Sequence, residues 1–167
     1  MERERANASR FTHADPASAI MRLFHYTIGR HLPRIVADGR LMPSDSFPGT
    51  ALAALWLSTN PVWEASIVKS TFQGGVRVLL DKEQIRDLGQ GLFRFEVQSG
   101  GHICTWREFI ARSGIDPDLA RRLEATGRDR GADPAEWYGA LRPILRDEWL
   151  EIALWDASAA QWEPVQL

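Results

Sequence analysis

Short apolar runs separated by turn residues organise the chain after residue 18. Apolar and β-branched runs of about four to eight residues predict strands, and apolar residues three and four positions apart predict helices. The strands are expected at 21–26, 55–59, 76–80, 92–97, 148–155 and 161–166. The helices are expected at 32–38, 62–72, 81–88, 106–113 and 116–126. Because the strand and helix groups are mostly separate in sequence, the pattern predicts an α+β fold.

Several element ends carry recognisable residues. Pro33 lies in the first turn of the first expected helix, and Gly39 can take the left-handed conformation that ends it. Asp116 is expected to cap the last helix, with Pro117 at its first position. The strand at 92–97 alternates apolar and charged residues, which is typical of a strand with one exposed face.

Length and composition predict a single domain. With 167 residues, of which 44% are hydrophobic, the chain can bury one substantial core. Residues 1–18 are charged or small and have no periodicity, so they are expected to form a flexible arm. The domain is therefore expected to span 19–167.

Charge and cysteine content limit the expected binding partners and cellular compartment of the protein. The 20 basic and 22 acidic residues give a net charge of -2, so the surface as a whole does not attract phosphate backbones or anionic membranes. A single cysteine, Cys104, allows no intrachain disulfide and suits a reducing compartment. No apolar run has the length of a membrane span or of a signal-peptide core. The expected location is the cytoplasm.

Several common catalytic motifs are absent from the sequence. There is no phosphate-binding loop of the Walker type, and the pair Gly89 and Gly91 lacks the third glycine and the helix of a dinucleotide fingerprint. No serine lies in a nucleophile elbow, and no paired histidines have the spacing of a zinc protease. His102 and Cys104 are two isolated candidate ligands, so no metal site is expected.

The positive signal begins at the first strand. Leu23-Phe-His-Tyr-Thr27 is followed by a short helix ending in Ala-Asp-Gly39 and then by Leu41 and Pro43. This order resembles the opening of the ADP-ribosyltransferase superfamily, which includes poly-ADP-ribose polymerases, rifampicin-inactivating transferases and DarT toxins. His25-Tyr26-Thr27 matches the His-x-Thr triplet of many members, although the central residue is commonly glycine.

Two later segments extend the resemblance. Leu55-Trp-Leu-Ser-Thr59 with its expected helix is similar to the strand and helix on which the family usually carries a tyrosine against nicotinamide. Trp56, or Trp63 on the helix, would take that place by stacking on the ring. Glu151-Ile-Ala-Leu-Trp155-Asp156 is similar to the strand that delivers the catalytic glutamate. Glu148 is the alternative acid.

The resemblance implies a split β-sheet with flanking helices, NAD as co-substrate and no metal. Glu151 would stabilise the positive charge that develops on the ribose when the bond to nicotinamide breaks. His25 would position the adenosine-side ribose, and Thr27 would help to orient the nicotinamide pocket. The expected NAD-binding residues are His25, Tyr26, Thr27, Trp56, Ser58 and Trp63. The expected reaction transfers ADP-ribose to an unidentified protein, nucleic acid or small molecule and releases nicotinamide.

Other interpretations of these residues stay open. His25 can be a satisfied core histidine, the tryptophans can be core packing, and Glu151 can be an ordinary strand residue facing solvent. Two other functions are also compatible: an RNA-end-processing enzyme similar to the RNA 2′-phosphotransferases, which share the fold, and a non-catalytic nucleotide-binding or interaction module. Acceptor choice is expected to depend on the segments 43–50 and 100–138.

Overall fold

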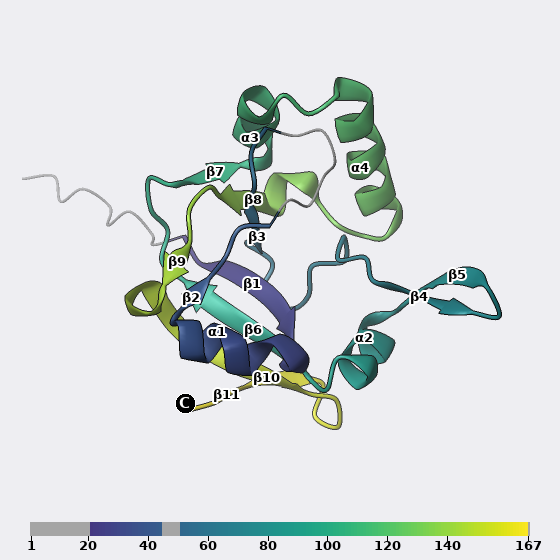
Figure 1. Ribbon diagram of the computed structural model, residues 1–167, viewed down its shortest axis with the longest axis vertical. Helices are drawn as coiled ribbons and strands as arrows, with labels where there is room; N and C mark the ends of the chain where they lie inside the picture. The colour runs from purple at the N-terminus through teal and green to yellow at the C-terminus, as the bar shows by residue number, and fades with distance from the viewer. Residues whose placement is uncertain (1–20, 45–50, 167) are drawn as a thin grey trace, which may run out of the picture.

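The computed structural model describes residues 21–44 and 51–166 (Figure 1). The expected arm at 1–18 and most of the expected loop at 43–50 lie outside these residues. Within the described part, the chain forms one large antiparallel sheet, two small two-stranded sheets and four α-helices. This confirms the α+β class.

The large sheet has seven strands in the order β11-β10-β6-β1-β3-β8-β7. Their bounds are β1 (Leu23–Ile28), β3 (Leu55–Ser58), β6 (Leu92–Val97), β7 (Ile103–Thr105), β8 (Trp137–Ala140), β10 (Trp149–Asp156) and β11 (Gln161–Pro164). One small sheet joins β2 (Arg40–Leu41) to β9 (Ile144–Leu145), and the other joins β4 (Ser70–Gln73) to β5 (Val76–Leu79). The hairpin of β4 and β5 projects away from the body of the molecule (Figure 1).

The helices are α1 (Leu32–Asp38), α2 (Lys82–Leu88), α3 (Trp106–Ser113) and α4 (Pro117–Asp129). Three short 3-10 turns lie at Gly29–His31, Pro134–Glu136 and Arg146–Glu148. In Figure 1, α3 and α4 gather beside β7 and β8, whereas α2 lies at the opposite side of the molecule. Among the helices of the described residues, none combines the length and the apolar character that crossing a bilayer requires.

Strand register divides the side chains of the large sheet between two faces. Phe24 is paired with Ser58 on one side and with Glu96 on the other, and Glu96 is paired with Glu151. Directly paired residues share a face, and neighbours along a strand alternate. We call the face that holds Phe24 the tryptophan face. The opposite one, which holds His25, is the α1 face.

Each face has its own core. On the α1 face, Leu23, Leu57 and Phe95 belong to a buried cluster against which Leu32 and Ile35 of α1 pack. The tryptophan face carries two clusters, and their buried members are listed here: Ala54, Cys104, Trp106, Phe109, Ile115, Ala120 and Trp137 near α3 and α4, and Leu80, Ile85 and Leu92 near α2. The sheet is therefore buried on both sides over its central strands.

The helix ends follow the local chemistry of the sequence. Gly39 ends α1 at φ 62°, in the left-handed region that favours glycine. Asp81 caps α2 by accepting from the Gln84 backbone amide at 2.8 Å, while the Gln84 side chain accepts from the Asp81 amide at 3.0 Å. As expected, Asp116 caps α4, accepting from the Leu119 amide at 2.8 Å.

The helix predicted at 62–72 is wrong. The chain there forms turns and then enters β4, with no helix between β3 and β4. The Asn60 side chain accepts hydrogen bonds from the backbone amides of Val62 and Trp63, at 3.0 and 3.3 Å. Such local side-chain bonds satisfy the backbone without a helical turn. Glu64, which belongs to this segment, is buried and accepts hydrogen bonds from Ser58 of β3 and Trp137 of β8, which hold the segment against the sheet.

The expectation of an exposed face on the strand at 92–97 is also wrong. β6 has the predicted bounds, but Arg94 and Glu96 are only 8% and 7% exposed. Glu96 accepts two hydrogen bonds from Arg22, and Arg94 donates to Glu151. Burial of charged groups is tolerated when they are paired in this way. The alternation of charge in this strand therefore marks paired buried residues.

Candidate functional site

The junction of β1 and β3 is the weakest contact within the centre of the large sheet. β1 is paired with β6 through six residue pairs, from Leu23 to Ile28, but its ladder with β3 is the single pair of Phe24 and Ser58. Two side chains continue the connection beyond this pair. His25 Nδ1 lies 3.0 Å from the Trp56 carbonyl oxygen, and the Tyr26 hydroxyl donates to the Asn60 carbonyl at 2.5 Å.

The imidazole of His25 has a defined protonation pattern. Burial lowers its pKa more than the hydrogen bond with the Trp56 carbonyl raises it, and the positive charge of Lys69 lowers it further, so the ring is neutral at pH 7. A carbonyl oxygen can only accept, so Nδ1 carries the proton and donates to Trp56. Nε2 is then a hydrogen-bond acceptor, and it has no partner among the described residues. The residue is half-buried.

Thr27 lies on the same face as His25, two positions further along β1, and is 9% exposed. His31 and Lys69 are exposed and come from the turn before α1 and the segment before β4. Neither residue belongs to a recognisable sequence motif, so the sequence alone does not single them out. Together the four residues offer one acceptor, one hydroxyl and positive charge at the α1 face of the junction.

Tyr26 and Trp63 meet on the tryptophan face. Their ring centroids are 5.3 Å apart at an interplanar angle of 70°, and Tyr26 also lies 5.6 Å from Trp162. Burial raises the pKa of Tyr26, so its hydroxyl stays protonated and donates to Asn60. These two expected NAD-binding residues are therefore close to each other but face away from His25.

Trp56 is part of the core near α3. Its ring lies 5.8 Å from that of Trp106 and 4.8 Å from that of Phe109, with edge contacts in both cases. Its place in β3 puts this ring on the tryptophan face. Only its backbone carbonyl reaches His25. Core packing is what the structure assigns to this side chain.

Ser58 belongs to a buried polar network centred on Glu64. The Ser58 hydroxyl donates to Glu64 at 2.8 Å, and the Trp137 indole and the Ser66 amide donate to it at 3.1 and 2.9 Å. Glu64 is 6% exposed. No sequence motif marks Glu64, because its partners Ser58 and Trp137 come from strands that only the fold brings together. The network fixes the segment that follows β3.

Glu151 lies on the tryptophan face. It accepts from Arg94 at 3.1 Å, and its side chain is 34% exposed. It borders a hollow of about 300 Å³ whose lining includes Trp149, Leu150 and Val165. Because Glu151 shares a face with Phe24, the sheet itself lies between Glu151 and the His25 imidazole. The structure does not bring these two expected catalytic residues together.

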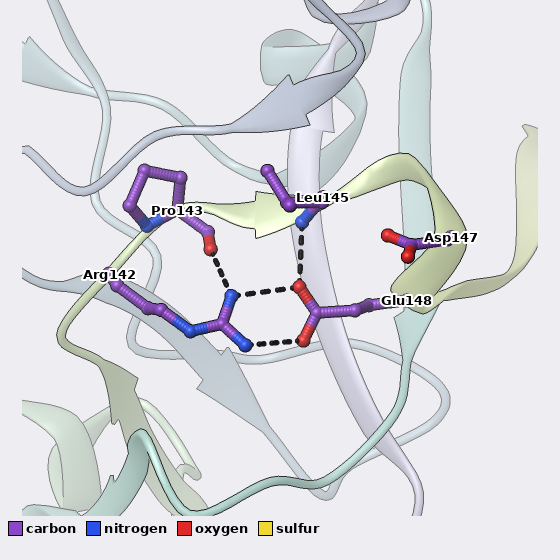
Figure 2. Close-up of a pocket in the computed structure, with 5 residues that line it drawn as sticks. All are labelled: Arg142, Pro143, Leu145, Asp147 and Glu148. Carbon is purple, nitrogen blue, oxygen red and sulfur yellow. Dashed lines mark hydrogen bonds and ion pairs between the residues drawn. The ribbon is translucent and has the colours of Figure 1, made fainter.

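Glu148 is engaged elsewhere. Figure 2 shows its carboxylate forming two hydrogen bonds with Arg142, both 2.9 Å, and accepting a third from the Leu145 amide. The hydrogen bond with Arg142 lowers the pKa of Glu148. The ion pair borders a hollow of about 480 Å³ that Pro143 and Asp147 also line. Glu148 is thus a structural partner of Arg142 in this arrangement.

Metal ligands do not gather in the described part of the chain: residues 21–44 and 51–166 contain no group of three or more His, Cys, Asp or Glu side chains arranged to hold an ion. In the comparisons with known proteins, no family model matches the chain, and neither a curated protein nor a solved structure matches it. The resemblance to ADP-ribosyltransferases accordingly rests on the quoted motifs.

Proposed function

We propose that this domain is an NAD-dependent ADP-ribosyltransferase whose NAD lies at the α1 face of the junction between β1 and β3. The observation that carries the proposal is the neutral His25, bonded across that junction to the Trp56 carbonyl. A ladder of one residue pair is also what a sheet split between these two strands requires. On this basis we assign the sheet to the split type of that superfamily.

The chemistry of the junction suits a nucleotide. A ribose hydroxyl can donate to His25 Nε2, because the other ring nitrogen is already committed as a donor. The positive charge of Lys69 favours the pyrophosphate of NAD nearby. Thr27 supplies a further hydroxyl on the same face. His25 is in this proposal a positioning residue for the dinucleotide.

ADP-ribose transfer also requires a catalytic acid. Transfer needs a carboxylate beside the nicotinamide ribose, where positive charge develops. Glu151 is the acid that the resemblance implies, but in this arrangement it lies across the sheet from His25 and is paired with Arg94, so it does not reach a ribose held at the α1 face. This placement favours a second candidate function, nucleotide binding without transfer.

The test is a calorimetric titration of the purified protein with NAD, with nicotinamide release measured by chromatography in the same samples. Saturable binding with release supports the transferase or an NAD hydrolase, since water is then the acceptor. Saturable binding without release supports the nucleotide-binding module or a transferase whose acceptor is missing from the sample. Absence of binding at millimolar NAD contradicts all of these and favours the RNA-end-processing or protein-interaction alternative.

Glu151→Gln separates the two candidates further, because the amide keeps the shape of the side chain and removes its charge. For a transferase, we expect nicotinamide release to fall by about a hundredfold or more with nearly unchanged NAD affinity. Glu163→Gln is the matched control, since Glu163 is an exposed acid on the neighbouring strand β11. Equal release in wild type and Glu151→Gln would remove Glu151 from the mechanism.

A further inference from the structure

Three tryptophan rings surround the ammonium group of Lys82. Its Nζ atom lies 2.9 Å from the ring centroid of Trp155, 5.4 Å from that of Trp162 and 5.5 Å from that of Trp63. The rings come from β10, from β11 and from the segment after β3, so the cluster exists only in the folded chain. All three distances are within the range of cation–π attraction.

The rings are held in place by their own hydrogen bonds. The Trp155 indole donates to Glu83 at 3.2 Å, and the Trp162 indole donates to the Val62 carbonyl at 2.8 Å. Trp155 and Trp162 pack at 5.3 Å with an interplanar angle of 59°. Since both N–H groups are satisfied at the ring edges, the ring faces can contact a cation.

Lys82 occupies this cluster without being needed to form α2. It is the first residue of the helix, whose capping box is made by Asp81 and Gln84 and whose buried anchor is Ile85. The lysine side chain can therefore leave while the helix stays docked. Burial lowers the pKa of Lys82 to about 8, and the negative charge of Glu83 offsets only part of this shift.

A primary ammonium is also a poor match for an aromatic cluster. It is compact and strongly hydrated, and its three N–H groups need acceptors that indole faces supply only weakly. A trimethylammonium group has no N–H to satisfy and carries its charge on apolar methyl groups, which is the chemistry that aromatic cages recognise. Arg94 also lies over Trp162, at 5.1 Å, but its guanidinium is held there by hydrogen bonds to Glu151 and to the Pro61 carbonyl. Among the described residues, Trp162 is the only ring of the cluster that lies within cation–π range of this guanidinium.

We propose that Trp63, Trp155 and Trp162 form a binding site for a trimethylammonium group, and that Lys82 is an internal competitor which fills the site until such a ligand displaces it. This proposal is independent of NAD binding, because the cluster lies on the tryptophan face and the His25 junction on the α1 face. The competing interpretation is a structural clasp in which Lys82 only ties α2 to β10 and β11.

The test titrates the full-length protein with choline and follows the indole N–H signals by NMR. The control ligand is 3,3-dimethylbutan-1-ol, which has the same shape without the charge. We expect choline, and not the neutral alcohol, to shift the signals of Trp155 and Trp162. In Lys82→Ala the affinity for choline should rise about tenfold, because the internal cation is gone. Lys82→Met, which still fills the space, is the matched control and should show a smaller gain.

Two further measurements keep the proposal open to contradiction. In the wild type, choline affinity should rise between pH 7 and pH 9, as Lys82 loses its charge and with it the cation–π attraction. Trp155→Leu should weaken choline binding about tenfold or more while the protein stays folded by circular dichroism. Absence of choline binding in both wild type and Lys82→Ala, or equal responses to choline and the alcohol, would establish the structural clasp instead.

The same titration identifies the source of the ligand. A peptide carrying trimethyllysine is compared with its unmethylated counterpart and with free choline. Tighter binding of the methylated peptide supports a ligand on a protein, and tighter binding of choline supports a small molecule. Equal binding of the methylated and unmethylated peptides, together with no response to choline, overturns the site.

Discussion

The two faces of the central sheet differ in their content of charged side chains. On the tryptophan face, Arg22 pairs with Glu96 and Arg94 pairs with Glu151, and Glu64 accepts from three donors. On the α1 face, β1 and β6 carry leucine, valine and phenylalanine, together with His25 and Thr27. The strands of the tryptophan face therefore carry several charged side chains, most of them in ion pairs. The strands of the α1 face carry few.

The two faces therefore differ in how many polar atoms remain available for a hydrogen bond. Buried charged groups that satisfy one another mainly set the geometry of the fold. A neutral histidine with one nitrogen bonded to a carbonyl keeps the other nitrogen as an acceptor, which is the atom that the proposed function uses. The comparison predicts that changes on the tryptophan face act first on stability and that changes at His25 act first on binding.

The largest expected loss of stability follows from removing the Glu64 carboxylate. In Glu64→Ala, the Ser58 hydroxyl, the Trp137 indole and the Ser66 amide lose their acceptor in a buried place. We expect the free energy of unfolding to fall by about 3 kcal/mol, measured by urea denaturation. Glu64→Gln keeps one acceptor oxygen and should lose less. A change below about 1 kcal/mol in the alanine variant would show that the network contributes little.

The second largest loss of stability is expected when the ion pair of Arg94 with Glu151 is broken. Arg94→Met should lower the free energy of unfolding by about 2 kcal/mol, because it removes a buried guanidinium that also donates to the Pro61 carbonyl. Glu151→Gln alone should cost less, since this carboxylate is partly exposed. A double-mutant cycle measures the coupling, and additive costs would mean that the pair acts as two independent groups.

At His25, two substitutions separate binding from stability. His25→Asn keeps a donor near the position of Nδ1, where it can still reach the Trp56 carbonyl, but removes Nε2. We expect NAD affinity to weaken about tenfold with the unfolding free energy nearly unchanged. His25→Ala should weaken NAD binding and also lower the free energy of unfolding, because it removes both ring nitrogens. Calorimetry and thermal denaturation report the two quantities, and unchanged affinity in both variants would remove His25 from the site.

A smaller effect is expected on lowering the pH. The pKa of His25 is below its ordinary value of 6.5, so the unfolded chain takes up a proton at a higher pH than the folded chain. Stability should therefore fall as the pH drops below about 6.5 and level off once the folded state is protonated too. Urea denaturation between pH 7 and pH 5 measures this slope. His25→Asn should reduce it, while the part due to His102, whose pKa is also lowered, should remain.

The smallest expected change is at the tip of the projecting hairpin. Phe72 is 72% exposed on β4, so Phe72→Ser removes little buried surface. We expect the free energy of unfolding to change by less than about 0.5 kcal/mol. Thermal denaturation checks this, and a larger loss would mean that the hairpin packs against other parts of the chain.

Local sequence signals predicted many of the elements. The bounds of α1, α3 and β6 are those expected, because each has a clear apolar period and recognisable end residues such as Gly39. The segment 62–72 was misjudged because the interactions of Asn60 and Glu64 outweighed its helical pattern. β7, β8 and β9 were not predicted, since β7 and β9 have only three and two residues and β8 ends in Gly139 and Ala140, which are poor strand formers.

The relative positions of the expected site residues could not be predicted from local sequence patterns either. The sequence singled out His25, Tyr26 and Thr27 as a triplet, but alternation along a strand puts the central residue on the other face. Trp155 and Trp162 are seven positions apart across a hairpin, and their approach to Lys82 depends on how α2 packs. Such distances between segments have no local signature in the chain.

By itself, the sequence determined the α+β class, the ends of several helices and the first strand with its histidine, because these depend on neighbouring residues. Only the tertiary structure decided which face each side chain occupies, since strand register relates residues far apart in the chain. Register places Glu151 beside Arg94 and across the sheet from His25. It also brings Trp155 and Trp162 together, and the packing of α2 then places Lys82 against them.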